Sequence, residues 1–281
     1  MHTTLISASE LSRLNDAVIV DCRFDLANPS AGEQAYDHAH IPGARYAHLD
    51  RDLSSPITPA SGRHPLPDPE RLAQTLASWG IESERQVIAY DAGNGMFAAR
   101  LWWLLRWLGH TKVAVLDGGF QAWVTAGLPT TSDRPTPQPA RFHAHRNDDL
   151  WVQAAQVAER VQRSDWRVLD ARAPERFRGE VEPLDTVAGH VPGAHNHPFA
   201  LNLNAESRFL SVDVLAARYR ESLAGAPADR TIAMCGSGVT ACHTLLAMEV
   251  AGLRNAKLYA GSWSEWIRDP SRPTASLKLT S

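Results

Sequence analysis

The sequence predicts an α/β protein made of two tandem domains, each a parallel sheet flanked by helices. A chain of 281 residues has room for two ordinary domains. Four blocks of its first half recur in the same order in its second half. Within each half, β-rich runs alternate with helical patterns, which is typical of parallel strands joined by crossover helices.

The internal repeat defines which positions correspond. The paired blocks are 17–23 with 166–172, 39–44 with 189–194, 85–109 with 230–252, and 112–123 with 255–266. The longest pair contains a short β-rich run, a glycine-bearing loop and a helical pattern. In this alignment Asp91 stands opposite Cys235, and His40 stands opposite His190. Because the two histidines occupy the same repeated turn, we interpret both as structural.

Local signals predict the boundaries of helices and domains. We expect helices over 68–79 and 211–223, with Asp68 and Asp213 at their N-caps. Four prolines make the segment 129–145 semi-extended, so it reads as a linker. The expected division is a non-catalytic first domain, a proline-rich linker and a catalytic second domain, over 1–128, 129–145 and 146–281.

Composition places the chain among ordinary globular proteins, with 44% hydrophobic and 21% charged residues. A formal net charge of −3 provides no basic field for a phosphate backbone, so nucleic acid is not an expected partner. The N-terminal segment lacks the pattern of a secretory signal, and no run approaches the ~20 apolar residues of a membrane span. We therefore expect a cytoplasmic protein with no membrane partner.

Three cysteines, Cys22, Cys235 and Cys242, are an odd number, which disfavours a disulfide framework in a reducing compartment. Cys235 ends a β-like run and begins the loop CGSGVTA, after which helical spacing resumes. Gly236 and Gly238 permit left-handed backbone, so amide N–H groups can converge on one point and add to the helix dipole. This environment favours the reactive thiolate, and we predict Cys235 as a nucleophile. Cys242 is expected to be buried.

Three other interpretations of this loop lack the residues they need. A cysteine-dependent phosphatase needs an arginine in the loop, and 236–242 contains none. A serine hydrolase elbow needs G-x-S-x-G, whereas Ser237 is flanked directly by glycines. Cys235 and Cys242 are too widely spaced for a zinc-ligand pair, and no compact Cys/His cluster follows.

The segments DCR…HIPGA and DAR…HVPGA, the DGG and AGS turns and CGSGVTA together resemble the tandem rhodanese family over nearly the whole chain. The resemblance implies two rhodanese-like domains, of which the first is inactive because Asp91 replaces the nucleophile. It also implies ping-pong transfer of sulfur from a small anionic donor to cyanide or a thiol through a Cys235 persulfide. No metal or organic cofactor is required by this chemistry.

The same resemblance suggests how a donor is bound. The loop is similar to that of the mercaptopyruvate-specific branch of the family, since thiosulfate-preferring members carry cationic side chains after the cysteine. Arg176 matches an arginine that binds the substrate carboxylate, with Arg178 as a weaker candidate. Leu184 occupies the region where a second such arginine is expected. The loop residues expected to contact substrate are Gly236, Gly238, Val239 and Thr240.

A proton relay of Ser237 with Asp52 and His64 is also implied by the resemblance, although the spacing of the last two is longer than the family pattern. The alternative is a capping Asp52, a solvated loop histidine and a hydroxyl that satisfies local backbone groups. Three tryptophans on one helical run are expected to pack in the core or at a domain interface, namely Trp102, Trp103 and Trp107.

The expected function is transfer of sulfur from 3-mercaptopyruvate. Two alternatives stay open at this point: a thiosulfate-preferring sulfurtransferase, and a persulfide carrier that serves a partner protein without turnover of small molecules. The absence of cationic side chains directly after Cys235 favours mercaptopyruvate among the three.

Overall fold

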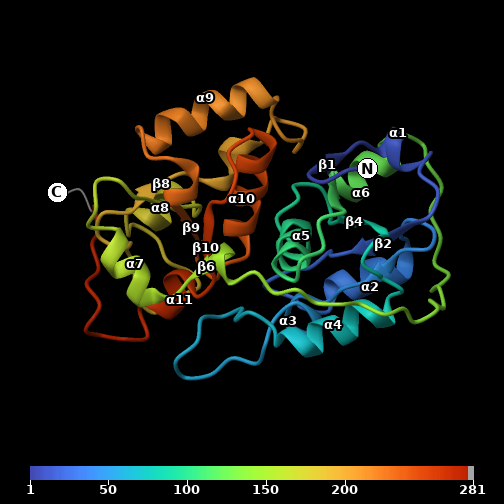
Figure 1. The fold of residues 1–281 in the computed structure, drawn as a ribbon, viewed down its shortest axis with the longest axis horizontal. Helices are drawn as coiled ribbons and strands as arrows, with labels where there is room; N and C mark the ends of the chain where they lie inside the picture. The colour runs from blue at the N-terminus through green and yellow to red at the C-terminus, as the bar shows by residue number, and fades with distance from the viewer. Residues whose placement is uncertain (278–281) are drawn as a thin grey trace. The chain divides into compact units, whose positions relative to one another are not determined.

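The computed structural model describes residues 1–277, which divide into two compact units (Figure 1). The first unit comprises residues 1–55, 66–148 and 204–209, and the second comprises 56–65, 149–203 and 210–277. Each unit contains one five-stranded sheet whose paired strands are all parallel, which confirms the predicted fold class. No helix within residues 1–277 is both long enough and apolar enough to cross a membrane.

The sheet of the first unit has the strand order β1-β5-β4-β2-β3. Its strands are β1 (Leu5–Ile6), β2 (Ala17–Asp21), β3 (Arg45–Tyr46), β4 (Gln86–Tyr90) and β5 (Val113–Leu116). The helices of this unit are α1 (Ala8–Leu11), α2 (Ala31–His38), α3 (Leu49–Asp52), α4 (Pro69–Ser78), α5 (Ala98–Trp107) and α6 (Gly119–Thr125). Strand β5 is buried along its whole length, as expected for an inner strand of a parallel sheet that is covered on both faces.

The second unit repeats this order as β6-β10-β9-β7-β8. Its strands are β6 (Trp151–Val152), β7 (Arg167–Asp170), β8 (His195–Asn196), β9 (Thr231–Met234) and β10 (Lys257–Tyr259). Its α-helices are α7 (Ala154–Arg160), α8 (Pro174–Phe177), α9 (Val212–Leu223), α10 (Thr240–Val250) and α11 (Ser262–Trp266). Short 3₁₀ turns are η1 (Asp148–Leu150), η2 (Phe199–Asn202) and η3 (Ala228–Arg230).

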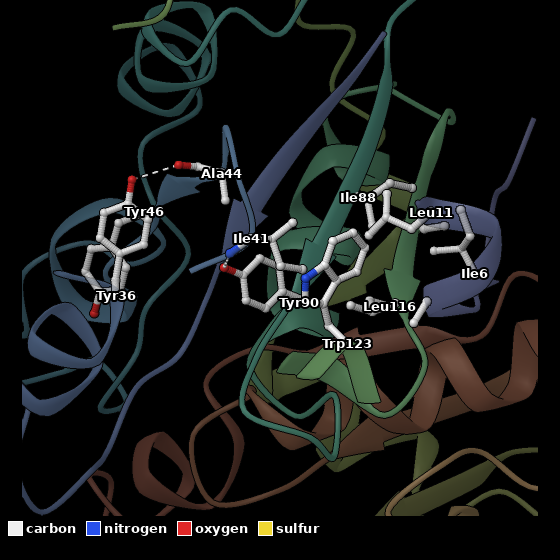
Figure 2. Close-up of a cluster of buried hydrophobic side chains, with 12 residues drawn as sticks. Ile6, Leu11, Tyr36, Ile41, Ala44, Tyr46, Ile88, Tyr90, Leu116 and Trp123 are labelled. Carbon is white, nitrogen blue, oxygen red and sulfur yellow. Dashed lines mark hydrogen bonds between the residues drawn. The ribbon is translucent and has the colours of Figure 1, made fainter. Parts of the chain in front are cut away.

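A core of aromatic and aliphatic side chains fills each unit. In the first unit, Trp123 packs with Tyr90, Ile88 and Leu116, and the hydroxyl of Tyr36 donates a hydrogen bond to the Ala44 carbonyl at 2.7 Å (Figure 2). The second core contains Trp263 and Trp266 on α11, together with residues of β7, β9 and β10. The expected burial of the α5 tryptophans is confirmed for Trp102, Trp103 and Trp107.

The sheet register confirms the alignment of the two halves. Asp21 at the end of β2 pairs with Tyr90 at the end of β4, and Asp170 at the end of β7 pairs with Met234 at the end of β9. The residue that follows the central strand is therefore Asp91 in one unit and Cys235 in the other. Parallel strands present their carboxyl ends at one edge of a sheet, which is where such folds place their functional loops.

The two predicted helix starts have different outcomes. Asp68 caps α4, because its carboxylate accepts the N–H of Arg71 at 2.9 Å. The prediction for Asp213 is wrong: α9 begins at Val212, its N-cap is Ser211, and Asp213 lies in the first helical turn. A carboxylate in the first turn still interacts favourably with the helix dipole. Asp213 therefore marks the start of the helix, although the N-cap lies two residues before it.

The repeated turns contain structural histidines, as predicted. The Nδ1 of His40 lies 2.7 Å from the Tyr36 carbonyl, and its ring stacks on Tyr36. His190 makes the same two contacts with Phe177. Its Nδ1 lies 2.7 Å from the Phe177 carbonyl, and the two rings stack. Each histidine also forms an isolated antiparallel bridge, His40 with Thr131 and His190 with Ala275.

The proline-rich segment 129–145 runs along the first unit. Besides the bridge at Thr131, the Ala140 N–H donates to the Ala77 carbonyl and the His145 N–H donates to the Leu108 carbonyl, both at 2.9 Å. Between these anchors the residues are mainly exposed. The segment is therefore tied to the first unit at intervals, and its role as a linker stays a prediction.

Candidate active site

Cys235 lies at the carboxyl end of β9, directly before the loop that leads into α10. Its side chain is buried, and its Sγ accepts a hydrogen bond from the N–H of Gly238 at 3.1 Å. The Cys235 N–H donates to the Ser262 hydroxyl at 3.0 Å, which anchors the start of the loop. A sulfur atom placed before the first turn of an eleven-residue helix lies where the helix dipole stabilises negative charge.

Helix α11 holds the other side of this loop. The Trp263 N–H donates to the carbonyl of Cys235 at 3.0 Å, and the Ser264 N–H donates to the carbonyl of Gly236 at 2.9 Å. These bonds fix two loop carbonyls against α11 while the Gly238 N–H points to the sulfur. The loop therefore directs an N–H donor, and not a carbonyl oxygen, toward the Cys235 sulfur.

The loop can approach α11 this closely because position 238 is glycine. Gly238 has φ +81°, a left-handed backbone conformation that residues with a Cβ rarely adopt. A Cβ at this position would lie 2.2 Å from the Ala260 carbonyl oxygen. Both the backbone conformation and the available space therefore require glycine.

The corresponding loop of the first unit shows how this backbone binds an anion. The Asp91 carboxylate accepts four backbone N–H bonds of 2.9–3.3 Å, from Gly93, Gly95, Phe97 and Ala98. Burial raises the pKa of Asp91, and the four amide donors act in the opposite direction. Converging amides of this kind form an anion-binding nest. In the second unit, Cys235 takes the position of that carboxyl group.

Ser237 and His64 lie together in the second unit although they are 173 positions apart in sequence. The His64 Nδ1 and the Ser237 Oγ are 2.8 Å apart, and both side chains are buried. His64 is therefore not a solvated loop histidine, so that part of the alternative is wrong. The pair has the geometry of a hydroxyl that exchanges a proton with an imidazole.

Asp52 belongs to the first unit, where it ends α3. Its Oδ2 accepts the N–H of His48, the N-cap residue of that helix, at 2.8 Å, and its Oδ1 lies 3.3 Å from the Arg51 Nε. These contacts match the capping alternative. Participation of Asp52 in a relay stays a prediction.

Two guanidinium groups lie beside the first loop residue after the cysteine. A Cβ built on Gly236 would lie 2.8 Å from an Nη of Arg63 and 3.5 Å from an Nη of Arg176. Arg63 is anchored through its own N–H, which donates to the Ser264 hydroxyl at 3.0 Å. Sequence reasoning missed Arg63. Its only sequence signal was its position next to His64.

Two acidic residues hold these arginines. The Glu182 Oε1 lies 2.6 Å from the Nη2 of Arg176, whose Nη2 also lies 3.3 Å from the Asp185 Oδ2. Asp185 forms a second, close ion pair with Arg63. Side chains of Glu182 and Asp185 are each only 4% exposed, so these carboxylates are part of the interior of the site.

The remaining candidates lie outside this group. Arg178 is partly exposed and forms an ion pair with Glu180 at 2.7 Å. Leu184 is exposed, and its N–H donates to Glu182 at 3.1 Å, so the segment turns its acidic residues inward and its leucine outward. Cys242 is buried as predicted, and its Sγ lies 3.3 Å from the Gly238 carbonyl oxygen.

No group of three or more His, Cys, Asp or Glu side chains arranged to hold a metal ion occurs among residues 1–277. All three cysteines are free thiols. The chemistry that the site can perform with its own side chains is nucleophilic attack by a thiolate next to two cations and a hydroxyl–imidazole pair.

Comparison with known proteins gives a consistent result. A family model described as rhodanese-like domain matches residues 7–126 and 153–269. A probable 3-mercaptopyruvate sulfurtransferase of Pseudomonas aeruginosa is 49% identical over 97% of this chain and 98% of its own length. A putative thiosulfate sulfurtransferase of Mycobacterium tuberculosis is 38% identical over 96% of this chain and 95% of its own length. Human 3-mercaptopyruvate sulfurtransferase is 35% identical over 85% of this chain and 81% of its own length.

Solved structures show the same relationship. The 3-mercaptopyruvate sulfurtransferase SseA from Escherichia coli superposes with a TM-score of 0.81 at 32% identity, over 94% of this chain and all of that one. The 3-mercaptopyruvate sulfurtransferase from Leishmania major superposes with a TM-score of 0.84 at 30% identity, over 94% of this chain and 74% of that one.

Proposed function

Because the chain belongs to the rhodanese-like family and is a sulfurtransferase, we propose that it moves sulfur from 3-mercaptopyruvate to cyanide or a thiol through a persulfide on Cys235. The observation that carries this proposal is the grouping of a buried cysteine, a hydroxyl–imidazole pair and two guanidinium groups around one loop. Relatives named for the same donor, at 49% and 35% identity, support it.

In the first step, the Cys235 thiolate attacks the thiol sulfur of mercaptopyruvate. A sulfur–sulfur bond forms, the carbon–sulfur bond breaks, and its electron pair passes to carbon as the enolate of pyruvate. Protonation of the enolate releases pyruvate and leaves Cys235 as a persulfide. In the second step, the acceptor attacks the outer sulfur and the Cys235 thiolate is restored.

Each nearby residue has a role in this scheme. The Ser237 hydroxyl, next to His64, donates a hydrogen bond to the developing enolate oxygen and relays the proton. Arg176 and Arg63 bind the donor carboxylate, so Arg63 supplies the second cation that Leu184 does not provide. Asp52 is proposed to orient His64, on the sequence pattern alone.

The backbone of residues 236–240 is proposed to line the donor site. Glycine at 236 leaves room for the guanidinium groups, and glycine at 238 directs an N–H to the sulfur. Val239 and Thr240 lie at the start of α10, where the helix dipole favours an anion.

The persulfide is tested by mass spectrometry after treatment with mercaptopyruvate. One added sulfur atom should appear on the peptide that contains Cys235, and Cys235→Ser should be inactive with every donor. Cys242→Ser, which alters a buried thiol outside the reaction, is the matched control and should keep the added sulfur. Turnover by Cys235→Ser would refute the mechanism.

The two-arginine clamp is tested by alanine substitution. Removing one partner of a desolvated charge pair costs about 2–4 kcal/mol, so Arg63→Ala and Arg176→Ala should each lower kcat/KM for mercaptopyruvate roughly 30- to 1000-fold. Arg178→Ala removes an exposed ion pair and should change kcat/KM less than about threefold. An effect of Arg178→Ala equal to that of Arg63→Ala would contradict the clamp.

Thiosulfate is the second candidate donor, since a relative at 38% identity is named for it and two guanidinium groups can bind a dianion. The deciding measurement is kcat/KM of the wild type for both donors, with cyanide as acceptor. A preference for thiosulfate of about tenfold or more would replace mercaptopyruvate as the donor and leave the Cys235 persulfide in place.

We also propose that the protein acts in the cytoplasm. A persulfide cycle needs a cysteine that returns to the thiolate after each turnover, and all three cysteines are free thiols. A reducing compartment maintains them in that state.

A further inference from the structure

A chain of alternating charges connects the sheet to the loop of Cys235. Asp170 at the end of β7 forms a bidentate pair with Arg172, whose Nε donates to Oδ1 and whose Nη2 donates to Oδ2. Arg172 also lies 3.5 Å from Glu182. Glu182 then pairs with Arg176, and Asp185 pairs with both Arg176 and Arg63. Three acidic and three basic side chains alternate along this chain, so its formal charge is zero.

The positions of Glu182 and Asp185 are unfavourable for a site that only has to attract anions. Both carboxylates are 4% exposed. Glu182 contacts Arg176, and Asp185 contacts both Arg176 and Arg63, the two guanidinium groups that lie beside Gly236. A buried carboxylate repels a bound anion because little water screens the interaction. Glu182 is also held in place by the N–H groups of Leu184 and Asp185, at 3.1 and 3.2 Å.

We propose that Glu182 and Asp185 determine donor specificity by neutralising the two clamp arginines, so that the site accepts a monoanionic donor and disfavours a dianionic one. This inference rests on the proposed function, in which the clamp binds the donor. The two acidic residues are positioning residues for Arg176 and Arg63, and in addition supply repulsion that grows with the charge of the ligand.

The charges of the two donors explain the selectivity. Mercaptopyruvate carries one negative charge, on its carboxylate, whereas thiosulfate carries two. Binding therefore brings the neutral network to −1 with mercaptopyruvate and to −2 with thiosulfate, next to a Cys235 thiolate. Repulsion by the Glu182 and Asp185 carboxylates acts twice as strongly on the dianion at the same distance.

A purely structural role for the two acidic residues predicts a different result. If they only orient the arginines, their loss should lower kcat/KM for both donors by the same factor. If their charge also selects the donor, their loss should change the ratio of the two kcat/KM values. The ratio for thiosulfate over mercaptopyruvate, called R below, therefore separates the two roles.

The experiment measures R, with cyanide as acceptor, for the wild type, Glu182→Gln, Asp185→Asn and Glu182→Asp. The exposed Glu180, which pairs with Arg178, provides the control Glu180→Gln from the same segment. Where thiosulfate turnover is too slow to follow, its inhibition constant against mercaptopyruvate replaces its kcat/KM. Far-UV circular dichroism identifies folded variants, and the two neutral variants provide independent tests.

We expect R to rise about tenfold in Glu182→Gln and in Asp185→Asn, which corresponds to ~1.4 kcal/mol. R should stay within about twofold of the wild type in Glu182→Asp, which keeps the charge, and in Glu180→Gln. An unchanged R in both neutral variants, or an equal rise in Glu182→Asp, would overturn the inference.

These outcomes are independent of the proposed donor. A wild type that prefers thiosulfate contradicts the proposed function, while the change in R between variants and wild type still tests the acidic residues. A wild type that prefers mercaptopyruvate, with an R that no neutral variant changes, contradicts the inference alone.

Discussion

Replacing Gly238 with alanine tests how the loop backbone supports the thiol. A residue with a Cβ at φ +81° costs about 1–2 kcal/mol. The Cβ would also lie 2.2 Å from the Ala260 carbonyl oxygen, a backbone atom that can move only with the end of β10. Overpacking of this kind adds roughly 1–3 kcal/mol. We therefore expect Gly238→Ala to lose about 2–5 kcal/mol of unfolding free energy.

Gly225→Ala is the matched control for this substitution. Gly225 has φ +91°, and a Cβ there would have no atom within 4 Å, so it carries the conformational cost without the clash. Gly225→Ala should therefore lose only about 1–2 kcal/mol of unfolding free energy. Urea denaturation of both variants measures the difference, on the same chain and with the same wild-type reference.

Gly238→Ala should also change the reactivity of Cys235. The clash moves the N–H that lies 3.1 Å from Sγ, and a hydrogen bond to a charged group contributes about 1.5–3 kcal/mol. Alkylation of Cys235 by iodoacetamide, followed by peptide mass spectrometry, should slow roughly 10- to 100-fold. Equal denaturation midpoints for the two variants, together with an unchanged alkylation rate, would refute the role given to this glycine.

Two further predictions concern stability and accessibility. Burial lowers the pKa of His197, so below the ordinary imidazole pKa of about 6.5 the unfolded chain binds a proton that the native chain does not. The free energy of unfolding should therefore decrease as pH falls from 7.5 to 5.5, and His197→Gln should show a smaller decrease; equal pH slopes would contradict this. Limited proteolysis should cut first within 129–145, between the anchors Thr131 and Ala140, and first cuts inside a repeated block would count against the linker.

Sequence alone was sufficient for features that depend on neighbouring residues. The paired blocks around Asp91 and Cys235 predicted two parallel sheets, because strand and helix periodicity is encoded within a few positions of each residue. Of the two glycines after Cys235, Gly238 has the left-handed backbone that the sequence indicated, and its N–H donates to the sulfur. Even there, local reasoning placed the cap of α9 at Asp213, because aspartate is a favoured N-cap residue, whereas the observed N-cap is Ser211.

Only the tertiary structure decided which distant groups surround the sulfur. The register of β7 and β9 brings the loop of Cys235 level with the segment after β7, where Arg176 and Glu182 lie. His64 contacts Ser237, which is 173 positions away in the sequence. Arg63, the residue before His64, lies beside Gly236. Partners of this kind leave no periodic or local pattern, since ion pairing depends on distance in space. Cys235 could therefore be proposed as the nucleophile from the sequence, whereas the charged groups beside Gly236 could be identified only in the fold.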